Sequence, residues 1–172
     1  MERQHFKTGW RRVGAAFLDT LVLWPLEWVE WGLIQLRVDG VIAVSWVLFQ
    51  TVLGVGYYVG AHAVFGATVG KAAMRVRVIA LDGSVPGWKR AALRDIVVLI
   101  LLPYTIVTSL PAAWDGLAHL TRTAEPSAAD KALGTAFILW FLLELLTMLF
   151  NRRRRALHDF IAGTVVIRTD VG

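Results

Sequence analysis

Two acidic residues, Asp19 and Glu144, lie inside stretches that are otherwise apolar enough to cross a membrane. Asp19 follows Arg12 by seven residues, and Glu144 precedes Asn151, where a run of arginines begins, by the same number. Seven residues of α-helix span about 10 Å, so the two carboxylates are expected at a similar depth. If both face the interior of a helix bundle, they could share a proton or bind a monovalent cation. A like charge in low dielectric raises one pKa, whereas a bound cation lowers both.

A structural role is the alternative for each acid. An ionised carboxylate inside hydrocarbon costs at least ~2.5 kcal/mol unless it is paired. Asp19 can accept hydrogen bonds from backbone or Ser/Thr groups, or pair with Arg12 or Arg94, and so fix the packing of helices. Glu144 can instead extend its long side chain to the membrane surface. The residue types leave both alternatives open.

A third acid, Asp159, stands between the arginine run and a β-branched segment near the end of the chain. Beside so many guanidinium groups it is expected to be ionised and hydrogen-bonded. Its predicted partners are Arg12, Arg94 or one of the arginines 152–155. Such a pair would act as a latch that holds the tail.

The segment Gly66-Ala-Thr68-Val-Gly70-Lys71 is similar to a phosphate-binding loop but lacks its spacing. That loop has four residues between its glycines and Ser or Thr after the lysine, whereas here three intervene and Ala72 follows. We also expect no amphipathic helix after it, so a glycine-permitted exit from the bilayer is the better interpretation. No spacing matches a zinc site and no nucleophile stands with a base, so we predict no metal, no other cofactor and no enzymatic activity.

The elements that must position these residues are membrane helices. The chain has 172 residues, of which 56% are apolar and none is cysteine, and its mean hydropathy is +0.57. A soluble domain of this size needs more polar surface, so the excess must face lipid. Crossing ~30 Å of hydrocarbon takes ~20 residues. We therefore predict an all-α membrane protein with four transmembrane helices, at residues 13–34, 41–65, 96–114 and 132–150.

The first of these stretches has an unusual outer third. Pro25 frees a helical carbonyl there, and a kink is expected. Trp24, Trp28 and Trp31 share one helical face, which suits lipid-facing anchors in the headgroup belt.

The cations predict the orientation. All but three of the 18 Lys and Arg residues lie before the first span, between the second and third, or after the fourth. Short basic segments stay cytoplasmic, so both termini, the loop 66–95 and the tail 151–172 are expected inside the cell, and the protein in the plasma (inner) membrane. The positive charge is then explained by topology and by anionic lipid headgroups. Nucleic-acid binding is not expected, because no exposed aromatics interleave a basic surface.

Two β-branched segments predict a small sheet on the cytoplasmic side. Residues 74–79 alternate as a strand and run to Asp82-Gly83, a hairpin-type turn, and residues 164–167 form a second run that could pair with the first.

The second span carries Gly56 and Gly60 in the spacing that lets helix backbones approach closely. We expect a tight helix contact there, within the chain or in a homodimer. His62, on the same span, is interpreted as an interface residue, because no partner is evident from the sequence.

In combination these motifs resemble the RDD family of membrane proteins, named for one arginine and two aspartates, over most of the chain. Arg12 through Asp19 resembles its opening, Gly66 through Lys71 its segment after the second span, and Leu93-Arg94 the entry to the third. Residues 157–164 resemble its closing motif. The resemblance implies a single membrane domain over residues 1–172, with the naming residues at Arg12, Asp19 and Asp159. Glu144 is outside that pattern.

The resemblance implies little about activity, although some RDD members are proposed as sodium/proton antiporters. One hypothesis is a small cation/proton-coupled transporter in which Asp19, together with Glu144, binds proton and cation alternately, and Arg12 and Arg94 set the carboxylate pKa. Four spans without an inverted repeat would require a homodimer for a pathway. The other hypothesis is a scaffold or accessory subunit whose buried charges lock its helices together.

Overall fold

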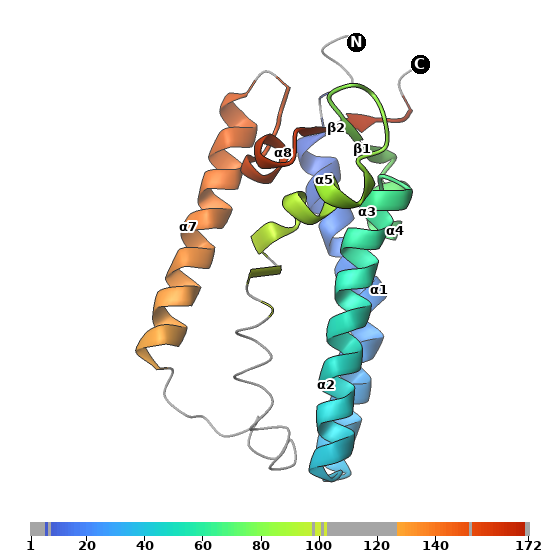
Figure 1. Ribbon diagram of the computed structural model, residues 1–172, viewed down its shortest axis with the longest axis vertical. Helices are drawn as coiled ribbons and strands as arrows, with labels where there is room; N and C mark the ends of the chain where they lie inside the picture. Colours follow the sequence, from blue (N-terminus) through green and yellow to red (C-terminus); the bar gives the residue numbers. More distant parts are fainter. Residues whose placement is uncertain are drawn as a thin grey trace.

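The computed structural model describes residues 6, 8–97, 99–100, 102, 127–151 and 153–170. Long helices extend from one end, where short helices and two strands form a cap (Figure 1). The long elements are α1 (Gly9–Gln35), then α2 (Gly40–Val55) continued by η2 (Gly56–Gly60) and α3 (Ala61–Val64), and α7 (Ala128–Phe150). The cap comprises α4 (Val69–Ala73), β1 (Val76–Ala80), α5 (Gly87–Arg94), α8 (Leu157–Ile161) and β2 (Thr164–Arg168).

Among the described residues, two helices are long and apolar enough to span a membrane. They are Gly40–Val64 and Ala128–Phe150, with mean hydropathies of 1.6 and 2.1 over their most apolar windows. Only 11% of the first window is buried inside the protein and none of the second. The core helix of a soluble protein hides such a surface, whereas a membrane helix leaves it to lipid. These two segments agree with the predicted spans 41–65 and 132–150.

The expectation of four spans is not confirmed. The first stretch, 13–34, does form a continuous helix, α1, which runs through Pro25. Its 27 residues correspond to about 40 Å. However, α1 is not among the helices apolar enough to qualify, because it carries several charged residues, Arg11, Arg12, Asp19, Glu27 and Glu30. Most of the third stretch, 96–114, lies outside the described residues.

The turn between α1 and α2 explains why these helices lie side by side (Figure 1). Asp39 caps α2 by accepting hydrogen bonds from the backbone of Val41 and Ile42, at 2.9 and 3.0 Å. Further along, Gln50 Nε2 donates to Glu30 Oε2 at 3.0 Å. Glu30 on α1 therefore has a hydrogen-bond partner on α2.

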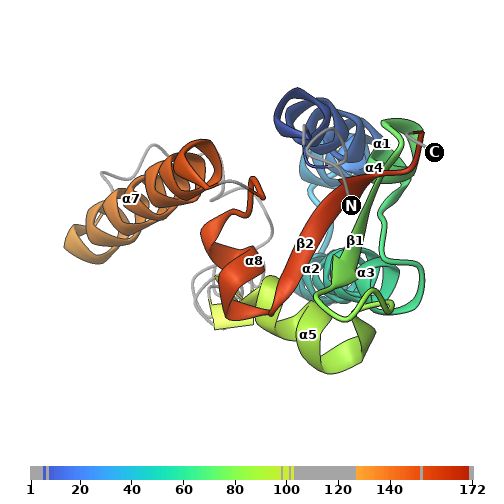
Figure 2. The same ribbon diagram turned by 90° about the horizontal axis from the view of Figure 1, so that it is seen from above.

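The predicted small sheet is confirmed. β1 pairs with β2 in antiparallel register, with Val78 opposite Val166, and α1 begins at the same end of the molecule as this sheet (Figure 1). Seen from above, the strands run between the ends of α1 and α3 (Figure 2). Val76, Val78 and Val166 form a buried core with Met74 against it. The turn at Asp82 and Gly83 follows β1, but the partner strand comes from the tail and not from a hairpin.

The cap also holds helices that the sequence analysis did not predict. α4, α5 and α8 lie in the loop 66–95 and the tail 151–172, and α4 begins directly within the Gly66–Lys71 segment. The sequence analysis expected no amphipathic helix after this segment and did not predict the five-residue helix that begins within it. Thr68 explains the start of α4, because its hydroxyl caps the helix by accepting from Lys71 N at 3.4 Å.

Gly56 and Gly60 delimit a π-helical turn, η2. In the described part of the chain, nothing lies within 4 Å of a side-chain position at Gly56, and Gly60 meets only the ring of Trp88, at 3.8 Å. The described residues therefore show no close contact between helix backbones there. A contact in a homodimer stays a prediction.

Candidate functional site

Asp19 is buried where α1 meets the beginning of the cap. Its side chain, in a residue only 2% exposed, accepts three hydrogen bonds. Oδ1 accepts from Gly70 N at 2.7 Å and from the Tyr57 hydroxyl at 2.5 Å, while Oδ2 accepts from Thr68 Oγ1 at 2.6 Å. We call Asp19, Tyr57, Thr68 and Gly70 the Asp19 cluster. Donors from η2 and from the start of α4 thus surround this carboxylate.

Gly70 lets α4 approach α1 this closely. A Cβ at this position would stand 2.2 Å from the carbonyl oxygen of Ala15 and 2.7 Å from Asp19 Oδ1. The other glycine of the motif, Gly66, has φ +69° and its carbonyl accepts from Val78 N at 2.7 Å. This segment therefore turns the chain from α3 towards α4 and presents donors to Asp19.

Lys71, His62 and Asp95 are connected in a row by polar contacts, and we call these three residues the Lys71 chain. Lys71 Nζ lies 2.8 Å from His62 Nε2, and His62 Nδ1 lies 3.0 Å from Asp95 Oδ2. If Asp95 is ionised, Nδ1 of His62 carries the proton and donates to it, and Nε2 accepts from the lysine. The chain therefore has a direction, from the ammonium through the imidazole to the carboxylate.

The π-helical turn helps to aim both clusters. Tyr57 and His62 are five residues apart, which in an α-helix puts side chains ~140° apart around the axis. In a π turn the hydrogen bonds run between residues five apart, so such residues come closer to one side. Tyr57 reaches Asp19 on α1, while His62 reaches Asp95 at the end of α5.

Burial makes the proton of Lys71 easier to remove than the proton of an ordinary lysine. Burial lowers the pKa of Lys71 to about 8, with the Arg94 charge adding to that effect, while Asp19 and Asp95 oppose it. Burial alone would raise the pKa of Asp95, but the His62 hydrogen bond and the nearby cations outweigh it and leave this pKa below its ordinary value. Lys71 can therefore change charge near neutral pH while Asp95 stays ionised.

The Asp159 cluster joins the tail to two other elements. Asp159 is fully buried and forms ion pairs through Oδ2 with Arg12 Nη1 at 2.8 Å and through Oδ1 with Arg94 Nη1. The same carboxylate accepts from Ala156 N at 3.0 Å, which starts α8. Burial alone would raise the pKa of Asp159, but Arg94 and Arg12 hold it well below its ordinary value.

Glu144 meets the cap through His158. Glu144 Oε1 pairs with His158 Nδ1 and accepts from Trp140 Nε1 at 2.9 Å. His158 Nε2 is 3.6 Å from Asp159 Oδ1, so this pair adjoins the Asp159 cluster. Across the described residues, no hydrogen bond or ion pair links Glu144 to Asp19. The structure thus gives the two predicted intramembrane acids separate partners.

The comparisons with known proteins agree with this arrangement of motifs. The RDD family model matches residues 7–163. The chain belongs to the RDD family. This is a membrane-associated family, and with its two apolar exposed helices this RDD protein is a membrane protein. No curated protein and no solved structure matches the chain.

The structure brings most of the predicted site residues of this RDD protein into neighbouring clusters. Arg12 and Arg94 both pair with Asp159, and Thr68 and Gly70 donate hydrogen bonds to Asp19. Lys71 belongs to the same loop motif as Thr68 but reaches His62 instead. No group of three or more His, Cys, Asp or Glu side chains that could hold a metal ion occurs in the ranges the structure describes.

Several participating residues were not predicted from the sequence: Tyr57, Asp95, Trp140 and His158. His62 was noted, but its partners lie 9 and 33 positions away, at Lys71 and Asp95. One signal in the sequence was available. Asp95 directly follows Arg94, so an acid and a base stand together at the entry to a predicted span, where an uncompensated charge is costly.

Proposed function

We propose that this RDD protein is a small cation/proton-coupled membrane transporter in which the Lys71 chain carries the proton. The observation that supports it is the continuous row from Lys71 Nζ through His62 to Asp95, at 2.8 and 3.0 Å. Proton relays in membranes are built from such buried acids and histidines.

Transfer along the row moves one proton without changing the total. Lys71 gives a proton to His62 Nε2 while the Nδ1 proton of His62 passes to Asp95. Asp95 then releases this proton from the row. The buried clusters have three cations and three carboxylates in the described chain, Arg12, Lys71, Arg94, Asp19, Asp95 and Asp159. Loss of one proton therefore leaves one net negative charge, which one monovalent cation balances.

Asp19 and Arg94 would act on Lys71 through charge. Asp19 favours the ammonium form and Arg94 disfavours it. In this proposal Asp19 keeps its hydrogen bonds and positions α4, whereas Glu144, with His158, links α7 to the cap. This differs from the hypothesis that Asp19 and Glu144 share one ion, because their separate partners favour separate roles.

A second candidate is a non-catalytic scaffold or accessory subunit with a buried charge latch. The observation that favours it is that Asp19 and Asp159 each have several hydrogen-bond or ion-pair partners. Buried polar groups with a structural role are normally satisfied in this way. In this candidate the buried charges hold helices and cap together, and the cap meets lipid headgroups or another protein. Neither candidate catalyses a covalent reaction.

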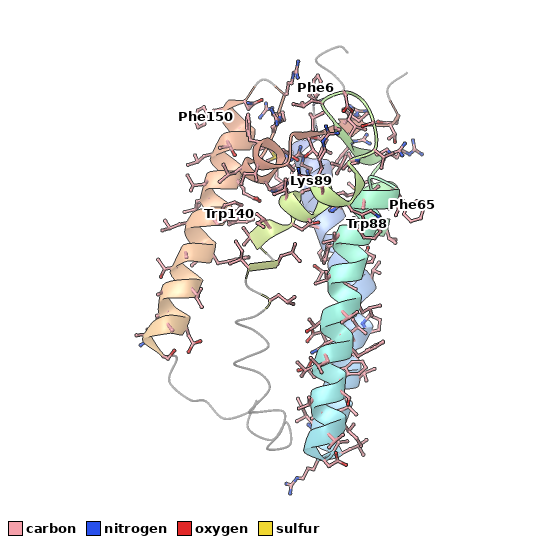
Figure 3. The ribbon with its side chains drawn as sticks, viewed as in Figure 1. Phe6, Phe65, Trp88, Lys89, Trp140 and Phe150 are labelled. Atoms are coloured by element: carbon pink, nitrogen blue, oxygen red, sulfur yellow. The ribbon has the colours of Figure 1, made fainter. Side chains whose placement is uncertain are left out.

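We further propose that the protein lies in the plasma (inner) membrane with its cap and both termini cytoplasmic. Phe65, Trp88 and Trp140 come from three segments and lie at similar heights along the long axis (Figure 3). Such a level suits the aromatic belt at a membrane surface. The exposed cations of the cap beyond it would contact anionic headgroups, and nucleic acid has no role. Because one copy is too small to line a transport pathway, the transporter would act as a homodimer.

Ion flux across a reconstituted membrane tests the transporter. The pure protein in proteoliposomes with an internal pH dye should give a cation-dependent pH change. Lys71→Met and His62→Asn should abolish this change, and Lys89→Met, an exposed lysine of the cap, should retain it. Asp19→Asn and Glu144→Gln compare the two acids directly. A wild-type signal no larger than that of empty liposomes would exclude the transporter. Lower stability of Asp19→Asn with no flux in any variant would support the scaffold.

A further inference from the structure

Three indoles and one carboxylate gather on the outer half of α1, away from the clusters described above. Trp24, Trp28 and Trp31 line, with Glu27, a hollow of about 360 Å³. This volume falls in the roughly 300–1,000 Å³ range of small-molecule sites. Trp24, Trp28 and Trp31 follow one another at one-turn spacings and Glu27 directly precedes Trp28, so a single helix presents the whole set.

The rings of this set are open to the surroundings. The three tryptophans are between 52% and 64% exposed. The rings of Trp24 and Trp28 are 6.3 Å apart at their centroids and are tilted by 55° to each other. They therefore diverge instead of stacking, which leaves ring faces free to take a ligand between them.

Glu27 has a charge that its surroundings do not balance. It is exposed and makes no hydrogen bond or ion pair with any described residue, whereas Glu30, one turn further on, bonds to Gln50. Glu27 follows Arg12 by fifteen residues, or about 22 Å of helix, which places it inside ~30 Å of hydrocarbon if Arg12 marks one surface. A carboxylate at that depth is costly unless it is protonated or paired, and a cation dissolved in the lipid phase can pair with it.

We propose that this hollow binds the ammonium group of an amphiphilic organic cation, with the alkyl tail of the ligand lying along α1 in the lipid. Indole rings attract cations through their negative faces, and recognition of quaternary ammonium by aromatic cages is the best-known use of this interaction. Glu27 supplies the opposite charge. A purely apolar ligand would leave that carboxylate unpaired, and a small inorganic cation would leave the three indoles without a role.

This site is independent of the proposed transport, because it shares no residue with the Lys71 chain. The bound ammonium could come from a zwitterionic lipid headgroup or from a foreign amphiphile, and the chemistry of recognition is the same. The test therefore contains one arm for each source.

The experiment uses the full chain in nanodiscs made of phosphatidylglycerol, whose headgroup carries no ammonium. Dodecyltrimethylammonium is titrated in one arm, phosphatidylcholine is added to the nanodisc lipid in the other, and tryptophan emission is followed. A saturable change is expected, with an apparent affinity weakened at least about tenfold by Glu27→Gln and by Trp28→Leu. Trp28→Phe, which keeps a weaker aromatic face, should weaken binding less.

Two controls decide the outcome. Trp10→Leu removes an exposed indole near the opposite end of α1 and should leave the affinity unchanged. An uncharged dodecyl ether of the same chain length should give no saturable change. Equal curves for the charged and uncharged amphiphiles, or equal affinities for the wild type and Glu27→Gln, would overturn the proposal and leave plain lipid anchoring. Binding in only one arm would identify the source of the ammonium.

Discussion

Arg12 Nη1 lies 2.8 Å from Asp159 Oδ2, although the two residues are 147 positions apart in the sequence. Arg94 binds the other oxygen of the same carboxylate. The carboxylate therefore fastens α1, α5 and α8 at one point. Because all three side chains are largely buried, loss of either arginine leaves the carboxylate buried without one of its partners.

Removing Arg94 should destabilise the protein strongly. Arg94→Gln removes one of the two arginines that pair with the buried Asp159, and breaking a buried pair in this way costs about 3–5 kcal/mol. Arg90→Gln is the matched control, four residues earlier on α5, where the ion pair with Asp82 is exposed. That change should cost less than about 1 kcal/mol. Thermal unfolding in detergent measures both, and equal losses would show that the Asp159 cluster is not a structural anchor.

Gly70→Ala should separate α4 from α1. The added Cβ would stand 2.2 Å from the Ala15 carbonyl oxygen, a backbone atom that cannot rotate away. We expect a loss of roughly 1–3 kcal/mol or more in unfolding free energy, as for other overpacked sites. Gly134→Ala on α7 is the control, because nothing lies within 4 Å of that position. It should leave stability unchanged or raise it by up to about 1 kcal/mol. A tolerated Gly70→Ala would contradict the close approach.

Much of the fold follows from local patterns in the sequence. The apolar runs predict the spans at Gly40–Val64 and Ala128–Phe150 closely, since length and hydropathy act within one segment. The two β-branched runs likewise predict the pairing of β1 with β2. The short helices of the cap have no such periodicity. α4 and α8 are five residues long, and side-chain capping and tertiary contacts decide where they begin.

The partners of the charged residues could be predicted only in part. A buried acid must find donors, so the sequence indicates that Asp19 and Asp159 are bonded. It does not indicate which donors these are. The phenol of Tyr57 reaches Asp19 because a π-helical turn alters the phase of the second span, and neither the turn nor this contact has a local signature. The partners of His62 could not be predicted for the same reason, since Lys71 and Asp95 lie outside its helix.

Stability should depend on pH through Lys71. Its pKa is about 8 in the folded protein, against the ordinary lysine value of 10.5 in the unfolded chain, so below pH 8 the group is protonated in both states and contributes no pH dependence. Between about pH 8 and 10.5 the unfolded chain binds more protons than the folded one. The unfolding free energy should therefore rise across this window, by up to about 3 kcal/mol.

Comparison with two variants isolates that contribution. Lys71→Met should lack this part of the rise, whereas Lys89→Met, at an exposed site on α5, should keep it. Unfolding by denaturant in detergent at several pH values between 7.5 and 10.5 provides the measurement. Parallel curves for the wild type and Lys71→Met would show that Lys71 keeps an ordinary pKa, and would remove the main electrostatic support for its role as proton carrier.

Adjacent tyrosines in η2 offer the sharpest test of the Asp19 cluster. The Tyr57 hydroxyl donates to Asp19 Oδ1 at 2.5 Å and accepts from Val69 N at 3.2 Å, so it joins α1, η2 and the start of α4. Tyr57→Phe removes one donor from a buried carboxylate and should cost about 1.5–3 kcal/mol, the usual effect of a hydrogen bond to a charged group. Tyr58→Phe deletes the same atom one residue later, where no hydrogen bond joins the hydroxyl to the described residues, and should change stability by less than about 0.5 kcal/mol.

Both variants keep the aromatic ring and the apolar contacts, so the difference between their unfolding free energies reports the hydroxyl alone. A difference near zero would mean that Asp19 is held by Thr68 and Gly70 without help from the second span.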